Sequence, residues 1–103
     1  MPSTKEFLHF VLDQLSDLEG VSVTAMMGEY LIRYRGKVIG GIYDDRFLVK
    51  PTASAKRLMP DAASDVPYPG AKEMLAADID DRDLMNRLIP AIADDLPEPK
   101  KRK

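Results

Sequence analysis

Apolar residues recur at three- and four-residue spacing near the start of the chain, over residues 4–18. This spacing places them on one stripe of a helix, with most of the charged residues on the other side. Ser3 and Glu6 fit a capping box at the start of this helix, and Gly20 fits its end. The segment predicts an N-terminal amphipathic helix, whose apolar stripe consists of Phe7, Leu8, Val11, Leu12, Leu15 and Leu18.

From residue 21 to residue 50 the apolar positions alternate with polar ones, which is typical of β-strands. Arg35-Gly36 and Asp44-Asp45 interrupt the alternation as short turns. Because such short connections join antiparallel neighbours, the segment predicts a four-stranded antiparallel meander with one wetter face. Gly40-Gly41 within the third strand predicts a bulge or a close approach of two backbones.

After the meander, Thr52 is expected to cap a short helix that stops at Pro60. Residues 60–71 contain three prolines, which exclude a helix and favour an ordered, extended loop. Residues 72–78 alternate again and predict one further strand.

The last apolar stripe predicts a C-terminal helix that Asp80 caps. Pro90 lies inside it and predicts a kink or a restart of the helix, since proline removes a backbone hydrogen bond and clashes with the preceding turn. The predicted fold class is therefore α+β, with an N-terminal helix, a four-stranded meander, a short helix, an extra strand and a kinked helix. We expect residues 1–96 to form one domain and residues 97–103 a disordered basic tail.

Composition narrows the chemistry that this domain can perform. The chain has 103 residues, of which 45% are apolar and 31% charged, as in one globular domain. It contains no cysteine, which excludes disulfides, thiolate metal sites and cysteine nucleophiles. The sole histidine, His9, falls on the polar side of the first helix, where a solvated histidine is the favoured interpretation. No apolar run approaches the roughly 20 residues that span a bilayer, and no signal peptide is evident, so a cytoplasmic protein is expected.

Charge is distributed unevenly along the chain. The net charge is −2, but Lys100–Lys103 supply four positive charges, and residues 1–99 carry 11 basic and 17 acidic side chains. The folded body is therefore expected to repel polyanions. The tail offers at most weak, salt-sensitive contact with nucleic acid.

Four carboxylates in six residues, Asp78, Asp80, Asp81 and Asp83, are the strongest candidates for metal ligands. A calcium loop needs glycine at its sixth position and a carboxylate at its twelfth, but here these positions hold Asp83 and Ile89. Helix capping is therefore the favoured interpretation. The meander glycines do not lie between a strand and a helix, so they form no phosphate cradle. We expect no metal, no cofactor and no catalytic residues.

Basic residues of the meander, with Tyr34 and Tyr43 nearby, are the candidates for an anion-attracting patch. Acidic neighbours in the same region can pair with them. A solvated face is the favoured interpretation, a protein-binding surface the second and a nucleic-acid surface the third. The basic residues are Arg33, Arg35, Lys37, Arg46 and Lys50.

Several segments together resemble the N-terminal domain of the TfoX/Sxy family. Residues 26–30, Met-Met-Gly-Glu-Tyr, resemble its Met-Phe-Gly-Gly-Tyr signature, and residues 35–37, Arg-Gly-Lys, resemble its hairpin. Residues 44–50 resemble its Asp-Asp-Arg-x-Tyr-Leu-Lys strand, and Pro67-Tyr68 falls where the family has a Pro-Phe-x-Tyr loop. The resemblance covers about residues 5–96.

This resemblance implies an α+β domain, a link to the regulation of natural competence in bacteria, and a regulatory role in transcription without established catalytic residues. Met27 and Glu29 depart from the family signature, and the helical second domain of its namesakes is not among these 103 residues. We expect a non-enzymatic module that binds another protein, with weak nucleic-acid binding as the alternative and a homodimer also open. The expected partner-binding residues are Met27, Glu29, Tyr30, Arg33, Arg35, Pro67 and Tyr68.

Overall fold

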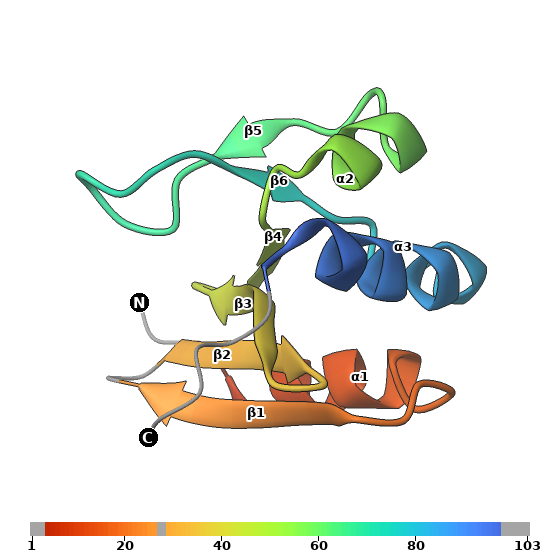
Figure 1. Cartoon of the computed structure of the whole chain (residues 1–103). Helices are drawn as coiled ribbons and strands as arrows, with labels where there is room; N and C mark the ends of the chain where they lie inside the picture. Colours follow the sequence, from red (N-terminus) through yellow and green to blue (C-terminus); the bar gives the residue numbers. More distant parts are fainter. Residues whose placement is uncertain (1–3, 27–28, 98–103) are drawn as a thin grey trace, which may run out of the picture.

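The computed structural model describes residues 4–26 and 29–97. Its strands form one antiparallel sheet in the order β1-β2-β3-β4-β6-β5, and the helices lie on one side of that sheet (Figure 1). The predicted α+β class and the four-stranded meander are confirmed. The elements, in chain order, are α1 (Lys5–Gln14), β1 (Val21–Met26), β2 (Glu29–Tyr34), β3 (Lys37–Tyr43), β4 (Arg46–Val49), α2 (Ala53–Leu58), β5 (Ser64–Asp65), β6 (Met74–Ala76) and α3 (Arg82–Asp95).

The start of α1 differs from the predicted capping box. Thr4 is the N-cap, and its Oγ1 accepts a hydrogen bond from the backbone N–H of Phe7 at 3.1 Å. The Thr4 N–H in turn donates to the carboxylate of Asp45 at 2.8 Å, so a contact distant in sequence places the cap. The prediction that Ser3 caps the helix is wrong, and Ser3 itself lies outside the described residues.

Two-residue turns join the strands of the meander. Arg35 and Gly36 have φ values of +52° and +85°, and Asp44 and Asp45 have values of +53° and +57°. Positive φ at both central positions gives the turn a twist that matches the twist of the flanking strands. Both turns therefore lie where the sequence predicts them.

The glycine pair in β3 occupies a bulge and a close approach of backbones. Ile32 pairs with Gly40 but Arg33 pairs with Val38, which leaves Ile39 as the extra residue in β3. A Cβ on Gly40 would lie 2.2 Å from the carbonyl oxygen of Leu48 in the neighbouring strand. Only glycine fits there, as the sequence predicts.

The proline-rich stretch contains a strand that sequence reasoning missed. Ser64 and Asp65 form β5, which pairs with β6, whereas the sequence predicts a loop over the whole of 60–71. Two residues are too few for alternation to be visible, and pairing with a distant strand creates β5. The further strand predicted over 72–78 is confirmed as β6, which pairs with β4.

The last helix begins one residue later than predicted. Asp81, not Asp80, is the N-cap, and its carboxylate accepts from the backbone N–H of Leu84 at 3.0 Å. The backbone carbonyl of Asp80 instead accepts from the side chain of Gln14 in α1 at 3.3 Å. Pro90 neither ends nor restarts the helix, which is one element from Arg82 to Asp95.

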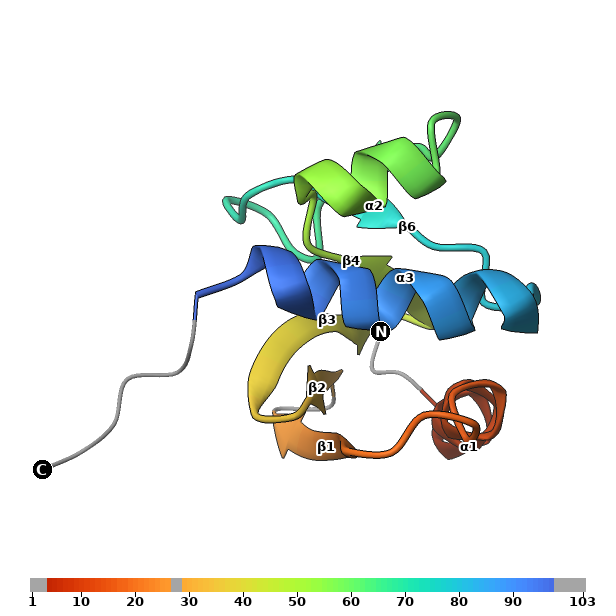
Figure 2. The same cartoon turned by 45° about the vertical axis from the view of Figure 1, so that its right-hand side comes forward.

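The main core lies between the sheet and the helices, with α3 crossing in front of the strands in Figure 2. Arg82 at the start of α3 donates to the carboxylate of Asp17 at 3.1 Å and to the hydroxyl of Ser16 at 2.6 Å, which ties the turn after α1 to α3. The largest fully buried side chains, all but Leu48 in this core, are Leu15, Ile32, Ile39, Ile42, Leu48, Met85, Leu88, Ile89, Ile92, Val11 and Val49.

Candidate interaction site on the outer face of the sheet

The outer face of the sheet, which we define as the face turned away from the helices, is hollowed between β3, β4 and β6. Cross-strand partners lie on the same face, so Leu48 and its partners Gly41 and Ala76 share this face. Tyr43 lies on the outer face as well, and its ring covers Gly41. A Cβ added to Gly41 would lie 2.8 Å from a ring carbon and 2.8 Å from the hydroxyl oxygen of Tyr43. The absence of a side chain at Gly41 makes room for the Tyr43 ring.

A bulge determines which part of β3 reaches this face. Strict alternation would place Val38 and Tyr43 on opposite faces, because they are five positions apart. The extra residue Ile39 shifts the alternation, and Val38 pairs with Arg33 on the outer face. Val38 and Tyr43 therefore lie on the same side of the sheet.

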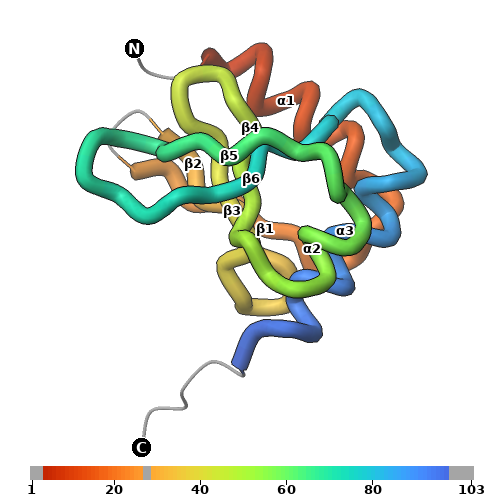
Figure 3. The backbone as a smooth tube through the Cα atoms, turned by 90° about the horizontal axis from the view of Figure 1, so that it is seen from above, coloured from red at the N-terminus to blue at the C-terminus, as the bar shows by residue number. Residues whose placement is uncertain are grey.

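The segment that connects β5 and β6, residues 66–73, stands away from the helices, as the view from above shows (Figure 3). We call it the hairpin loop. Arg46 anchors its beginning, since its guanidinium forms an ion pair with Asp65 and its Nε donates to the carbonyl of Tyr43 at 3.1 Å. The hydrogen bond from Arg46, followed by that from the backbone N–H of Val66, lowers the pKa of the Asp65 carboxyl. The pairing of β5 with β6 and this ion pair hold the loop over the outer face.

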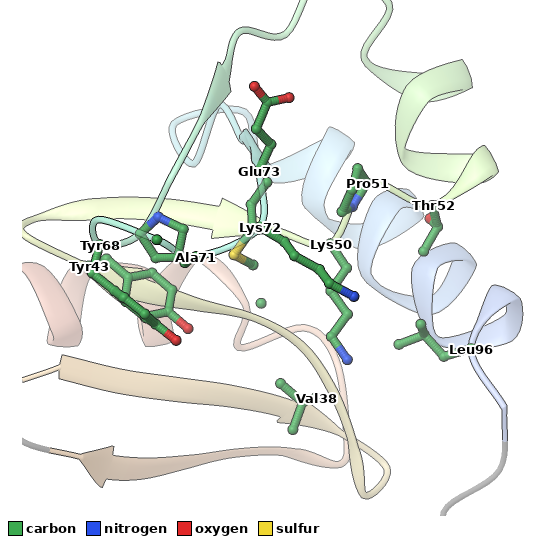
Figure 4. Close-up of a pocket in the computed structure, with 14 residues that line it drawn as sticks. Val38, Tyr43, Lys50, Pro51, Thr52, Tyr68, Ala71, Lys72, Glu73 and Leu96 are labelled. Carbon is green, nitrogen blue, oxygen red and sulfur yellow. The ribbon is translucent and has the colours of Figure 1, made fainter.

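Between the hairpin loop and the sheet lies an open cavity of about 710 Å³, which we call the outer groove (Figure 4). This volume is within the range of ligand pockets. Its lining is mainly apolar and comes from β3, the segment after β4, the hairpin loop, β6 and the residue that follows α3. The lining includes Val38, Tyr43, Lys50, Pro51, Pro67, Tyr68, Lys72, Met74 and Leu96.

Two tyrosines form one wall of the outer groove and lie side by side in Figure 4. Tyr43 is 7% exposed, whereas Tyr68 is 59% exposed at the rim. Burial raises the pKa of the Tyr43 phenol, and the nearby Tyr68 and Glu29 raise it further. Tyr43 is therefore a neutral, buried part of this wall, and Tyr68 presents a large aromatic surface to solvent.

Lys50 and Lys72 extend into the outer groove from different walls, Lys50 from the end of β4 and Lys72 from the hairpin loop (Figure 4). The third charged lining residue is Glu73, whose carboxylate points away from the two ammonium groups in the same view. The groove thus combines apolar walls with two positive charges.

A second cavity of about 570 Å³ lies on the other side of the hairpin loop. Pro67 and Tyr68 line both cavities, and Glu29 and Asp44 line the second. The carboxylate of Glu29 accepts from the backbone N–H of Asp44 at 3.1 Å. The structure therefore brings together three of the predicted partner-binding residues, namely Glu29, Pro67 and Tyr68.

The other predicted residues lie elsewhere. Tyr30 is half-buried against the core on the helix side of the sheet. Arg33 lies on the outer face near the β1 edge, where its guanidinium donates to the Thr24 hydroxyl. Arg35 is in the turn after β2, and its guanidinium lies 5.4 Å from the centre of the Tyr34 ring. Met27 lies outside the described residues.

The basic residues of the meander do not form one patch. Arg35 lies past the end of β2 with a positive φ, so it does not share a strand face with Arg33. Lys37 donates to the backbone carbonyls of Ala93 and Leu96 at 2.8 and 3.2 Å. Of the five basic residues considered, only Lys50 lines the outer groove.

Within the ranges 4–26 and 29–97, no group of histidine and acidic side chains has the arrangement of a metal site. Asp81 caps α3, in keeping with the capping interpretation of the acidic cluster. His9 is exposed on α1. None of the helices in these ranges is long and apolar enough to cross a membrane.

Sequence reasoning missed Lys72, Val38 and Leu96 as site residues. Lys72 reaches the groove because β5 pairs with β6, and Val38 because of the bulge at Ile39. The signal that pointed toward this region was the proline-rich run beside Tyr68, which separates two short strands.

Comparison with known proteins places the chain beside a relative from the bacterium Spirochaeta aurantia. That protein is described as "Uncharacterized 12.7 kDa protein in trpE 5'region" and is 34% identical over 105 residues, spanning 100% of this chain and 91% of its own length. No family model matches the chain, and no solved structure matches it. Identity at this level over the whole chain shows common descent, and the chain belongs to the same protein family as the Spirochaeta aurantia protein.

Proposed function

We propose that this protein is a small, non-enzymatic interaction module of the cytoplasm that binds a segment of another protein in the outer groove. Its resemblance to the TfoX/Sxy N-terminal domain supports a regulatory role, with a component of the transcription machinery as the partner. Membership of the TfoX/Sxy family and a link to natural competence are part of the same proposal.

The observation that carries the proposal is the outer groove itself. It is an open, largely apolar cavity of about 710 Å³ on a sheet face that the helices leave uncovered. The exposed ring of Tyr68 stands at its rim, on a loop that contains Pro67 and Pro69. A proline-restrained loop loses little conformational entropy on binding, and aromatic side chains dominate many interfaces.

Photo-crosslinking in living cells tests this proposal. A benzophenone amino acid at position 68 should yield one discrete crosslinked protein, because the ring of Tyr68 borders the groove. The same amino acid at position 9 is the matched control, since His9 is exposed on α1 on the helix side of the sheet. Val38→Glu, which introduces a charge into the groove, should abolish the crosslink at position 68. Equal labelling from both positions, or a crosslink that survives Val38→Glu, contradicts the proposal.

Nucleic-acid binding is the alternative function, and Lys50 and Lys72 on the outer face are the observation in its favour. Against it, residues 1–99 carry six more acidic than basic side chains. Fluorescence anisotropy with single-stranded and double-stranded oligonucleotides distinguishes the two functions. Binding that weakens steeply with salt and is lost on removal of residues 97–103 would favour the alternative.

A further inference from the structure

We propose that the outer groove recognises an acidic side chain, aspartate or glutamate, presented next to an apolar side chain in the bound protein segment. This inference rests on the proposed function, because it names the chemistry of the segment that the same groove binds. It follows from two positive charges, from the absence of carboxylate partners for them among residues 4–26 and 29–97, and from the apolar walls around them.

The two charges come from residues that are distant in sequence. Lys50 follows β4 and Lys72 belongs to the hairpin loop, yet both line the outer groove and extend toward the side where Val38 and Leu96 lie (Figure 4). The fold thus concentrates positive charge at one end of a cavity in a chain whose body is acidic overall.

Within the described part of the chain, no carboxylate lies within ion-pair distance of Lys50 or Lys72. The acidic lining residue Glu73 points away from both (Figure 4). Two ammonium groups that line the same cavity repel each other. A carboxylate placed between them relieves this repulsion and forms charge-assisted hydrogen bonds.

The apolar walls define the rest of the ligand. Val38, Met74 and Pro51 line the groove around the two lysines. An apolar side chain next to the acidic one would remove these walls from water, which the acidic group alone would not do. The net negative charge of residues 1–99 disfavours a polyanion, so an isolated carboxylate in an apolar context fits the site better than a phosphate backbone.

Selection of random 12-residue peptides displayed on phage, with the full chain as bait, tests the inference. The wild-type chain should enrich peptides that contain Asp or Glu beside an apolar residue. The double variant Lys50→Glu/Lys72→Glu should enrich Lys or Arg at that place instead. The matched control Lys5→Glu/Lys56→Glu makes the same change in net charge at exposed positions outside the groove and should keep the acidic preference.

Affinity measurements on a selected peptide sharpen the result. Lys50→Gln and Lys72→Gln should each weaken binding by about tenfold or more, because each removes a charged hydrogen-bond donor. Replacement of the peptide's acidic residue by its amide should weaken binding to the wild type similarly and have little effect on the double glutamine variant.

The outcomes separate this inference from the proposed function. Peptides that require Val38 and Tyr68 but show no acidic preference would overturn the inference and leave the groove as a peptide site. Failure to enrich any peptide that depends on Val38 and Tyr68 would overturn both. Displacement of selected peptides by a single-stranded oligonucleotide at equal concentration would overturn both in favour of nucleic acid.

Discussion

The glycines of this chain show how a single missing Cβ determines local structure. Gly40 has no space for a side chain, since its Cβ would lie 2.2 Å from the Leu48 carbonyl oxygen. We expect Gly40→Ala to lower the free energy of unfolding by more than about 2 kcal/mol, because the backbones of β3 and β4 must separate. Urea denaturation of the purified variant measures this change.

Gly70→Ala is the matched control. Its Cβ would meet no atom within 4 Å, and only its φ of +87° opposes a side chain. The expected cost is about 1 kcal/mol, from backbone strain alone. If the two alanine variants lose equal stability, the close approach at Gly40 does not limit packing.

The ion pair between Asp65 and Arg46 gives the hairpin loop a pH dependence. The hydrogen bond from Arg46 lowers the pKa of the Asp65 carboxyl below the ordinary value of 3.8. The charged form of Asp65 is therefore more favoured in the native state than in the unfolded chain. Its stabilising contribution is therefore present above pH 3.8 and is lost as the pH falls through the lower, native-state pKa.

We expect Asp65→Asn to be less stable than the wild type at pH 7 and equal to it once Asp65 is protonated. Urea unfolding of both proteins over a series of pH values measures this difference. Asp61→Asn is the control, because Asp61 is an exposed carboxylate outside the hairpin loop. A difference between Asp65→Asn and wild type that persists unchanged into strong acid contradicts this assignment.

At the scale of elements, helix caps depend on details that sequence spacing does not resolve. Asp80 and Asp81 are adjacent and chemically identical, but only the carboxylate of Asp81 accepts from the Leu84 N–H. Asp81→Ala should therefore cost about 1 kcal/mol of unfolding free energy. Asp80→Ala should cost a few tenths at most, and thermal unfolding of the two variants checks the contrast. Equal losses would mean that helix-dipole charge matters more than the cap.

The sequence predicts the long elements well because their periods repeat often enough to be visible. The meander alternates over about thirty residues, and α1 and α3 each carry an apolar stripe. β5 has only two residues and exists through its pairing with β6, which no local pattern reveals. The sequence predicts a kink or a restart at Pro90. The helix does not restart there, because the core residues Leu88, Ile89 and Ile92 hold both halves of α3 against the sheet.

At the scale of the whole molecule, β1 is the long exposed edge of the sheet. Among the described residues it pairs with β2 alone, and its six residues include no charge and no proline. Such an edge lacks the usual features that prevent strand pairing. We expect the protein to self-associate through β1, which accords with the homodimer left open by the sequence.

Val23→Lys should shift this equilibrium toward monomer, because a lysine on an edge strand opposes edge-to-edge pairing. Val66→Lys is the matched control, since Val23 and Val66 are 36% and 37% exposed but Val66 lies in the hairpin loop. Sedimentation equilibrium over a range of protein concentrations measures the effect. A wild type that stays monomeric at the highest concentration contradicts the expectation.

The sequence alone determined the fold class, the order of the long elements and the two turns. These features depend on local periodicity and on backbone preferences that each segment carries itself. Only the tertiary structure decided that Lys50 and Lys72 line one groove and that Val38 joins them. The bulge at Ile39 changes which face Val38 occupies, and the β5–β6 pairing carries Lys72 over the sheet. Both features arise from contacts between strands. The free energy of such a contact depends on two segments that are separate in the sequence, so neither segment alone reveals it.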